Sequence, residues 1–186
     1  MFGHRFIKGL ALIAAIVVAA LAGYSVLAQS DSDALRIEVA EDGNRFVFSQ
    51  ERLFDDGMPQ YGTPFVTQGY IYPEGTLNGS NGVLPNGEAE FPEDVLGTWT
   101  CYGYMIGDGG HSTTGEWVIS TQVYQFEDGT IVTDGFELVD LDTPISRAIT
   151  GGTGEYVNVS GEQVQELRGF TEQMGVNLVV EFQIAE

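Results

Sequence analysis

Polar and amphipathic side chains recur on the strand-like runs of this chain, and these residues could bind or transform a small molecule. Tyrosine combines an apolar ring with a hydroxyl, whereas glutamine, glutamate and arginine offer hydrogen bonds or protons. Arg147 and Glu116 are the candidate catalytic residues, and Arg147 is favoured because arginines are scarce here. The candidate ligand-binding residues are Gln68, Tyr70, Tyr102, Tyr104, Gln122, Tyr124 and Tyr156.

Each candidate also has a purely structural interpretation. An alternating strand turns one face to solvent, where glutamine, glutamate and tyrosine are ordinary residues. Arg147 could equally form a surface ion pair with one of the many carboxylates. Both interpretations stay open for each of these residues.

Metal and cofactor chemistry receive little support from the sequence. Beyond the first 28 residues the chain has one histidine, His111, which argues against a transition-metal site or a Ser-His-Asp triad. The acidic turns lack the oxygen-ligand spacing of a calcium loop. The Gly-Gly-Thr-Gly run from Gly151 lacks the Gly-Lys-Ser/Thr end of a phosphate loop. We therefore expect no metal and no cofactor.

The single cysteine, Cys101, excludes an intrachain disulfide. It lies in an alternating run in which Trp99, Cys101 and Met105 share one face. We interpret Cys101 as a buried packing residue rather than a nucleophile.

Short alternating segments that must position these residues fill most of the chain. They predict strands at 65–72, 97–106, 116–126, 130–139, 145–150, 162–170 and 176–184, with weaker ones at 35–39 and 45–48. No segment after residue 28 has a convincing helical period. Many short strands joined by glycine-rich turns indicate an all-β fold, and eight antiparallel strands can close into a barrel that holds one small ligand.

Two segments have other predicted roles. Residues 1–28 resemble a signal peptide, with basic residues before an apolar run of ~13 residues and small residues at Val26 and Ala28. An uncleaved membrane anchor is the alternative. Residues 29–186 then form one domain, secreted or extracytoplasmic. Residues 73–96 are rich in proline and glycine, and we interpret them as a long loop that could act as a lid.

The formal net charge of −20 restricts the partners. So acidic a chain repels nucleic-acid phosphates and anionic lipid surfaces. We expect no nucleic acid, no membrane contact after signal cleavage, and a small hydrophobic or phenolic molecule as the ligand. A homo-oligomer stays open, and so does adaptation to high salt.

The segment from Ile149 to Glu162 holds the closely spaced glycines Gly151, Gly152 and Gly154. Glycine permits positive φ angles and close backbone approach, so this is a tight corner between strands. The segment resembles the Gly-Gly-Thr-Gly-x-(Phe/Tyr)…Gly-Glu signature of the allene oxide cyclase barrel-like and dirigent-like proteins. Residues 69–76 and 97–101 also look like bacterial, secreted members of that group.

The resemblance implies a closed antiparallel eight-stranded, calycin-like barrel. It also implies a cyclase-like, isomerase or stereo-directing activity, in which an apolar cavity orients a reactive molecule. The alternatives are a lipocalin-like carrier and a packed structural barrel. A cavity with an inward arginine or carboxylate would favour the enzyme, whereas a wholly apolar cavity would favour the carrier. Valine at Gly152 or Gly154 should impair folding, whereas a change of Arg147 should affect ligand handling alone.

Overall fold

The computed structural model describes residues 34–185, and these residues form one antiparallel β-sheet whose strands alternate between inward and outward side chains. Within this range there is no α-helix, and no helix is long and apolar enough to cross a membrane. The elements are β1 (Leu35–Glu41), η1 (Gly43–Arg45), β2 (Val47–Phe48), β3 (Pro64–Pro73), η2 (Pro92–Asp94), β4 (Gly97–Met105), η3 (Gly109–His111), β5 (Glu116–Phe126), β6 (Gly129–Leu138), β7 (Ile145–Gly154), β8 (Gly161–Phe170) and β9 (Val176–Ile184).

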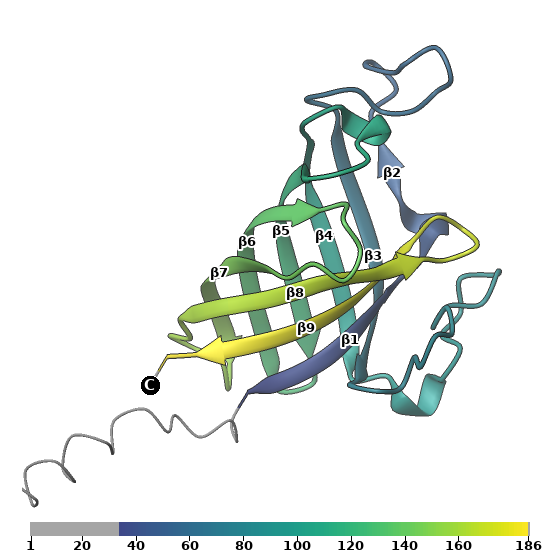
Figure 1. The fold of residues 1–186 in the computed structure, drawn as a ribbon. Helices are drawn as coiled ribbons and strands as arrows, with labels where there is room; N and C mark the ends of the chain where they lie inside the picture. Colours follow the sequence, from purple (N-terminus) through teal and green to yellow (C-terminus); the bar gives the residue numbers. More distant parts are fainter. Residues whose placement is uncertain (1–33, 186) are drawn as a thin grey trace, which may run out of the picture. The chain divides into compact units, whose positions relative to one another are not determined.

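The sheet closes on itself as an eight-stranded barrel (Figure 1). Strands β3 to β9 pair in chain order, and β1 pairs with β9 on one side and with β3 on the other. The closing pairs run from Ile37 opposite Pro73 to Glu41 opposite Gly69. The predicted closed antiparallel barrel is therefore confirmed.

Most predicted strands agree with the structure, and two differ from it. The expected strand at 45–48 shrinks to the two residues of β2, which pairs with β3 beyond the end of β1 and is not one of the eight barrel strands. The expected strand at 145–150 continues to Gly154 because Gly151–Gly154 pair with β6. The glycines therefore belong to a strand and do not only separate two strands.

Two of these glycines are required by close backbone contacts. A Cβ atom on Gly152 would lie 2.4 Å from the Tyr156 carbonyl oxygen and 2.6 Å from that of Thr130. Gly154 has φ +62°, and a Cβ there would lie 2.1 Å from the Asp128 carbonyl oxygen. No other residue can occupy these positions without displacing the backbone.

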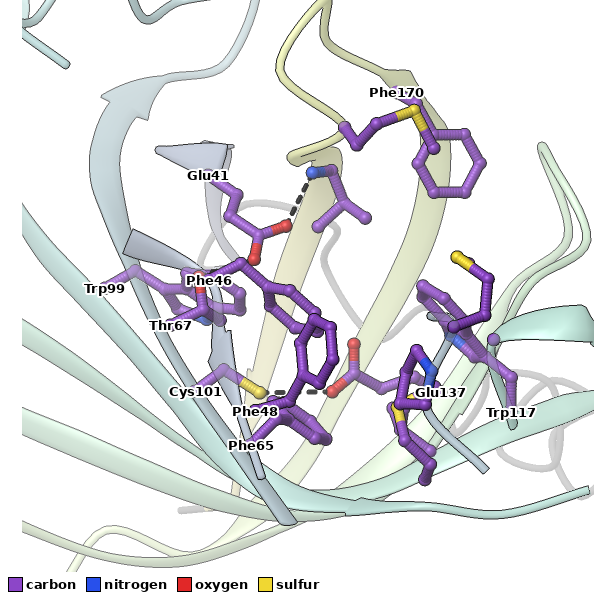
Figure 2. A pocket seen from close by; sticks show the side chains of 17 residues that line it. Glu41, Phe46, Phe48, Phe65, Thr67, Trp99, Cys101, Trp117, Glu137 and Phe170 are labelled. Atoms are coloured by element: carbon purple, nitrogen blue, oxygen red, sulfur yellow. Dashed lines mark hydrogen bonds between the residues drawn. The ribbon is translucent and has the colours of Figure 1, made fainter. Parts of the chain in front are cut away.

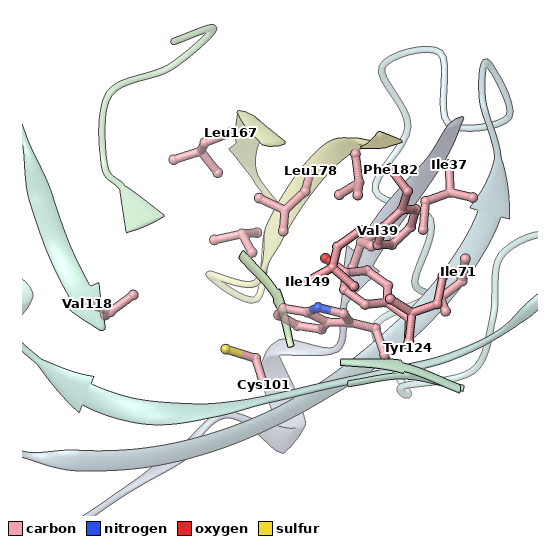
Figure 3. Close-up of a cluster of buried hydrophobic side chains, with 14 of the residues drawn as sticks. Ile37, Val39, Ile71, Cys101, Val118, Tyr124, Ile149, Leu167, Leu178 and Phe182 are labelled. Carbon is pink, nitrogen blue, oxygen red and sulfur yellow. The ribbon is translucent and has the colours of Figure 1, made fainter. Parts of the chain in front are cut away.

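Inward side chains fill the barrel with apolar residues (Figure 3). Strand β9 shows the pattern most clearly, since Val176, Leu178, Val180 and Phe182 alternate inward and are all buried. The ring of Tyr124 meets the ring of Phe182 edge-on, with centroids 4.9 Å apart. Such packing replaces the missing disulfide as the source of stability.

The long segment 73–96 packs against the outer wall of β1 and β3 (Figure 1). Leu77 and Val83 bury Ala40 and Tyr72 in a second hydrophobic cluster. The Tyr72 hydroxyl donates to the Gly82 carbonyl at 2.6 Å, and burial raises the pKa of Tyr72 to about 12. The lid role stays a prediction for this segment. The predicted signal peptide, residues 1–28, lies outside the described residues.

Candidate functional site

A cavity of about 200 Å³ opens at the end of the barrel where β1 and β6 end and β5 and β9 begin (Figure 2). Its wall is mainly aromatic and aliphatic, and it includes two glutamates and one cysteine. The lining residues are Glu41, Phe46, Phe48, Met58, Pro59, Phe65, Thr67, Trp99, Cys101, Met105, Gly110, Trp117, Val118, Glu137, Phe170, Met174 and Val176.

Aromatic rings from separate elements converge on this cavity. Phe46 precedes β2, and its ring lies 5.6 Å from those of both Phe48 and Phe65. Across the cavity, Trp117 meets Phe170 edge-on at 6.2 Å. Aromatic walls of this kind suit a small flat apolar molecule.

Glu41 supplies a buried carboxyl group to the wall. Its side chain follows Ile37 and Val39 on the inner face of β1 and is only 4% exposed. The Thr67 hydroxyl donates to Oε1, and the Val176 amide donates to Oε2 at 2.6 Å. Burial disfavours the charged carboxylate more than these hydrogen bonds favour it, and the pKa of Glu41 rises to about 7.

Glu137, near the end of β6, is the second buried carboxyl group. Its Oε1 accepts hydrogen bonds from the Ser120 hydroxyl and from the Cys101 thiol, whose sulfur lies 3.4 Å away. Nη1 of Arg147 approaches the same oxygen at 3.7 Å. Glu137 therefore has a cationic partner, whereas no arginine or lysine in residues 34–185 forms an ion pair with Glu41.

The thiol of Cys101 is a poor nucleophile in this setting. Its pKa lies well above the usual range, first because the thiol is buried and also because Glu137 is close. The protonated thiol donates a hydrogen bond and fills the wall between Trp99 and Met105. The structure therefore supports the interpretation of Cys101 as a packing residue.

The carboxyl group of Glu41 is suited to exchange a proton with a bound molecule. A carboxyl group with a pKa near 7 populates both protonation states at neutral pH, which suits a general acid or base. The apolar wall excludes water and so strengthens electrostatic interactions with the ligand. Residues 34–185 contain no group of three or more histidine, cysteine, aspartate or glutamate side chains that could hold a metal ion.

Three of the nine residues predicted as site residues point into the barrel. Arg147 is 2% exposed and donates to the carbonyl oxygens of Ser120 at 2.8 Å and Phe136 at 3.0 Å. Gln122 and Tyr124 are fully buried deeper in the barrel, where the Tyr124 hydroxyl donates to Gln122. Arg147 contacts the site through Glu137, and none of the three lines the cavity.

The other six predicted residues lie away from the cavity lining. Gln68 and Tyr70 lie on the outer face of β3, where Gln68 accepts from Arg45 and Tyr70 donates to Gly87. The remaining four are exposed or half-buried on the outer surface or in the turn after β7: Tyr102, Tyr104, Glu116 and Tyr156. Their roles in binding or catalysis stay predictions that this placement does not favour.

Glu41 and Glu137 are not among the residues predicted from the sequence, although the sequence contains a signal for both. Glu41 follows Ile37 and Val39 at a spacing of two, and Glu137 lies on the same face of its strand as Ile131 and Thr133, four residues after Thr133. A carboxylate that continues the apolar face of a strand belongs on the inside of a barrel. Trp117 gave no such signal, because a bulge between Glu116 and Val118 interrupts the alternation.

No protein-family model matches the chain, and no curated protein matches it. Solved structures do resemble it. A pyocyanin demethylase is 15% identical with a TM-score of 0.51, and the match covers 80% of this chain and 99% of that one. The pterocarpan synthase dirigent protein PsPTS1 is 16% identical with a TM-score of 0.55, and the match covers 80% of this chain and 90% of that one. GePTS1, another pterocarpan synthase dirigent protein, is 12% identical with a TM-score of 0.51, and the match covers 81% of this chain and 84% of that one. The described part of the chain therefore has the barrel fold of the allene oxide cyclase and dirigent proteins.

Proposed function

We propose that this barrel binds a small aromatic or other apolar molecule and catalyses its isomerisation or cyclisation, with Glu41 as the group that moves a proton. The observation that carries the proposal is a buried carboxyl group with a pKa near 7 in the wall of an aromatic cavity. Such a reaction conserves atoms, because the proton that Glu41 gives to one position of the substrate is recovered from another.

The cavity supplies orientation and exclusion of water. Rings on opposing walls hold a flat molecule in one pose, and this reduces the entropy that a ring closure or rearrangement must lose. Thr67 and the Val176 amide hold the Glu41 carboxyl group in place, so that it faces the ligand in a defined orientation. Both features raise the rate without a cofactor.

Two observations favour an enzyme over a carrier. The cavity wall contains Glu41 and Glu137, which a carrier of apolar molecules does not need and which cost free energy to bury. Proteins of the same fold, such as the pyocyanin demethylase and pterocarpan synthase, bear names that denote action on small organic molecules. We extend that class of activity, though not those substrates, to this chain, and we keep its secreted location as a proposal.

The test compares the full-length chain with Glu41→Gln and with a matched control, Glu38→Gln. Glu38 is also buried on β1 but faces segment 73–96, where it accepts from the Leu77 amide. Each protein is incubated with a small-molecule extract of the native host, and products are separated by reversed-phase and chiral chromatography with mass detection.

We expect a compound to change retention time at constant mass with the wild-type chain and with Glu38→Gln, and at least ~100-fold more slowly with Glu41→Gln. If a compound binds to the protein but is not converted, the barrel is a carrier and the proposed catalytic function is wrong. Equal conversion by all three proteins would remove Glu41 from the mechanism.

A further inference from the structure

Trp117 enters the cavity wall because of an irregularity in β5. Glu116 pairs with Leu138 and Val118 pairs with Glu137, so Trp117 is an extra residue without a partner on β6. A regular strand would place residues 117 and 118 on opposite faces, yet both line the cavity. Bulges re-aim side chains in this way and are common beside functional sites.

The indole N–H of Trp117 is buried, and it has no hydrogen-bond partner within residues 34–185. A buried donor without an acceptor costs about 1–3 kcal/mol, so few are retained without a reason. The ring itself is fixed, since Phe170 packs edge-on against it at 6.2 Å (Figure 2). Trp117 therefore holds a buried donor that no group in residues 34–185 uses, in a side chain that lines the cavity.

Trp99, the other tryptophan in the lining, provides a contrast. Its indole nitrogen also lacks a partner of good geometry within the described residues. However, it lies close enough to the Tyr124 hydroxyl to lower the pKa of that group, against the larger effect of burial. The Trp99 donor thus points to a protein oxygen, whereas no protein oxygen within residues 34–185 is paired with the Trp117 donor.

We infer that the Trp117 indole N–H binds a carbonyl oxygen of the ligand, so that the substrate class is a small aromatic carbonyl compound. The inference rests on the proposed function, because it places this ligand in the same cavity. An indole can only donate, so the ligand must contribute the lone pair. Proton transfer beside a carbonyl places negative charge on its oxygen, and a fixed donor stabilises that charge.

The experiment uses two probes with the same skeleton. Acetophenone carries a C=O group where α-methylstyrene carries C=CH₂, so the pair isolates the acceptor. Dissociation constants are measured by NMR for the full-length chain and for Trp117→Phe, which keeps an aromatic ring and removes the donor. The chain has two tryptophans, and the variant identifies which of the two indole N–H resonances belongs to Trp117.

We expect acetophenone to bind the wild-type chain about 3- to 10-fold more tightly than α-methylstyrene, as one net hydrogen bond predicts. It should also move the Trp117 indole proton downfield. In Trp117→Phe this advantage should disappear while the affinity for α-methylstyrene stays unchanged. If Trp117→Phe does not fold, Trp99→Phe assigns the two indole resonances instead, and the shift of the Trp117 proton in the wild-type chain then decides the question.

The outcomes separate this inference from the proposed function. Equal affinity of the two probes with no selective indole shift, or an acetophenone preference that survives in Trp117→Phe, overturns the inference and leaves the apolar cavity intact. Failure of both probes to bind the wild-type chain overturns the cavity on which the proposed function depends.

Discussion

The two halves of the barrel interior differ in how they treat polar groups. In the deep half, the amide nitrogen of Gln163 lies 2.8 to 3.1 Å from acceptor oxygens of Gln122, Tyr124 and Gln165, and these side chains are almost entirely buried. In the open half, Glu41 and Glu137 face a cavity lined with aromatic rings. The polar side chains of the deep half mainly form hydrogen bonds with one another. In the open half, the two glutamates border empty space that a ligand could occupy.

The contrast shows how one sheet can serve stability and chemistry at once. The deep network adds rigidity, because its members hold one another in place. The open half has fewer packing contacts around its cavity, and it contains the Glu41 carboxyl group, whose pKa is raised to about 7. Both features lower the stability of the fold, and the raised pKa makes Glu41 suitable for proton transfer. Substitutions in the deep half should therefore reduce stability, and substitutions in the open half should change ligand binding.

The largest effect is expected at the glycine corner. Gly154→Val should prevent folding, because the new Cβ would overlap the Asp128 carbonyl oxygen and φ is +62°. Circular dichroism and analytical gel filtration measure the loss. Gly75→Val is the control, since it has φ +85° but open space, and it should still fold. If both variants fold equally well, close contact is not what requires glycine at 154.

The next prediction compares two phenylalanines directly. Phe182→Ala in the deep half should cost about 4 kcal/mol of unfolding free energy, because its fully buried ring leaves a cavity. Phe48→Ala should cost about 1 kcal/mol, because its ring already borders open space. Urea denaturation measures both. Similar costs would mean that the two halves are packed alike.

Arg147 couples the two halves, and its burial changes the expectation drawn from sequence. Arg147→Met should destabilise the fold by about 3 kcal/mol, because Glu137 would be left buried without its cation. This expected result differs from the one drawn from the sequence, in which a change of Arg147 affects ligand handling alone. The double variant Arg147→Met with Glu137→Gln should recover part of the loss in thermal melting. A double variant less stable than Arg147→Met alone would show that the ion pair is not the cause.

The pH dependence of stability should reveal Glu41. Its pKa is about 7 in the folded chain and near 4.5 when unfolded, so the folded state binds the proton more tightly. This contribution to stability is complete below pH 4.5 and is lost as the pH rises through 7. Relative to Glu41→Gln, the wild-type chain should lose about 2–3 kcal/mol between pH 4.5 and 7.5. Parallel stability curves for the two proteins would contradict the raised pKa.

The fold was predictable because alternation is a local property. The strands at 116–126 and 176–184 were placed with their observed ends, and the shared face of Trp99, Cys101 and Met105 is the inner one. The site was less predictable. The phenol groups of Tyr102 and Tyr104 predict ligand-binding residues, but their face of β4 is the outer one, with about half of each residue exposed. Polar chemistry alone does not reveal which face of a strand is enclosed.

Two further features depend on tertiary structure and leave weak traces in sequence. The bulge that turns Trp117 inward requires the pairing of β5 with β6, and no local pattern announces it. The prolines and glycines of segment 73–96 predict a loop, but its position on the outer wall depends on the packing of Leu77 with Tyr72 and on the hydrogen bond from Tyr72 to Gly82.

Closure of the barrel between β1 and β3 has a consequence for the behaviour of the protein at high concentration. Each of the eight barrel strands has a hydrogen-bonded neighbour on both sides, and β2, which extends beyond the closure, is only two residues long. Free strand edges are what recruit other chains into aggregates. Aggregation should therefore begin from molecules in which the five β1–β3 residue pairs have separated. The rate at which β1 and β3 separate, rather than the free energy of global unfolding, should determine how fast the protein aggregates during storage.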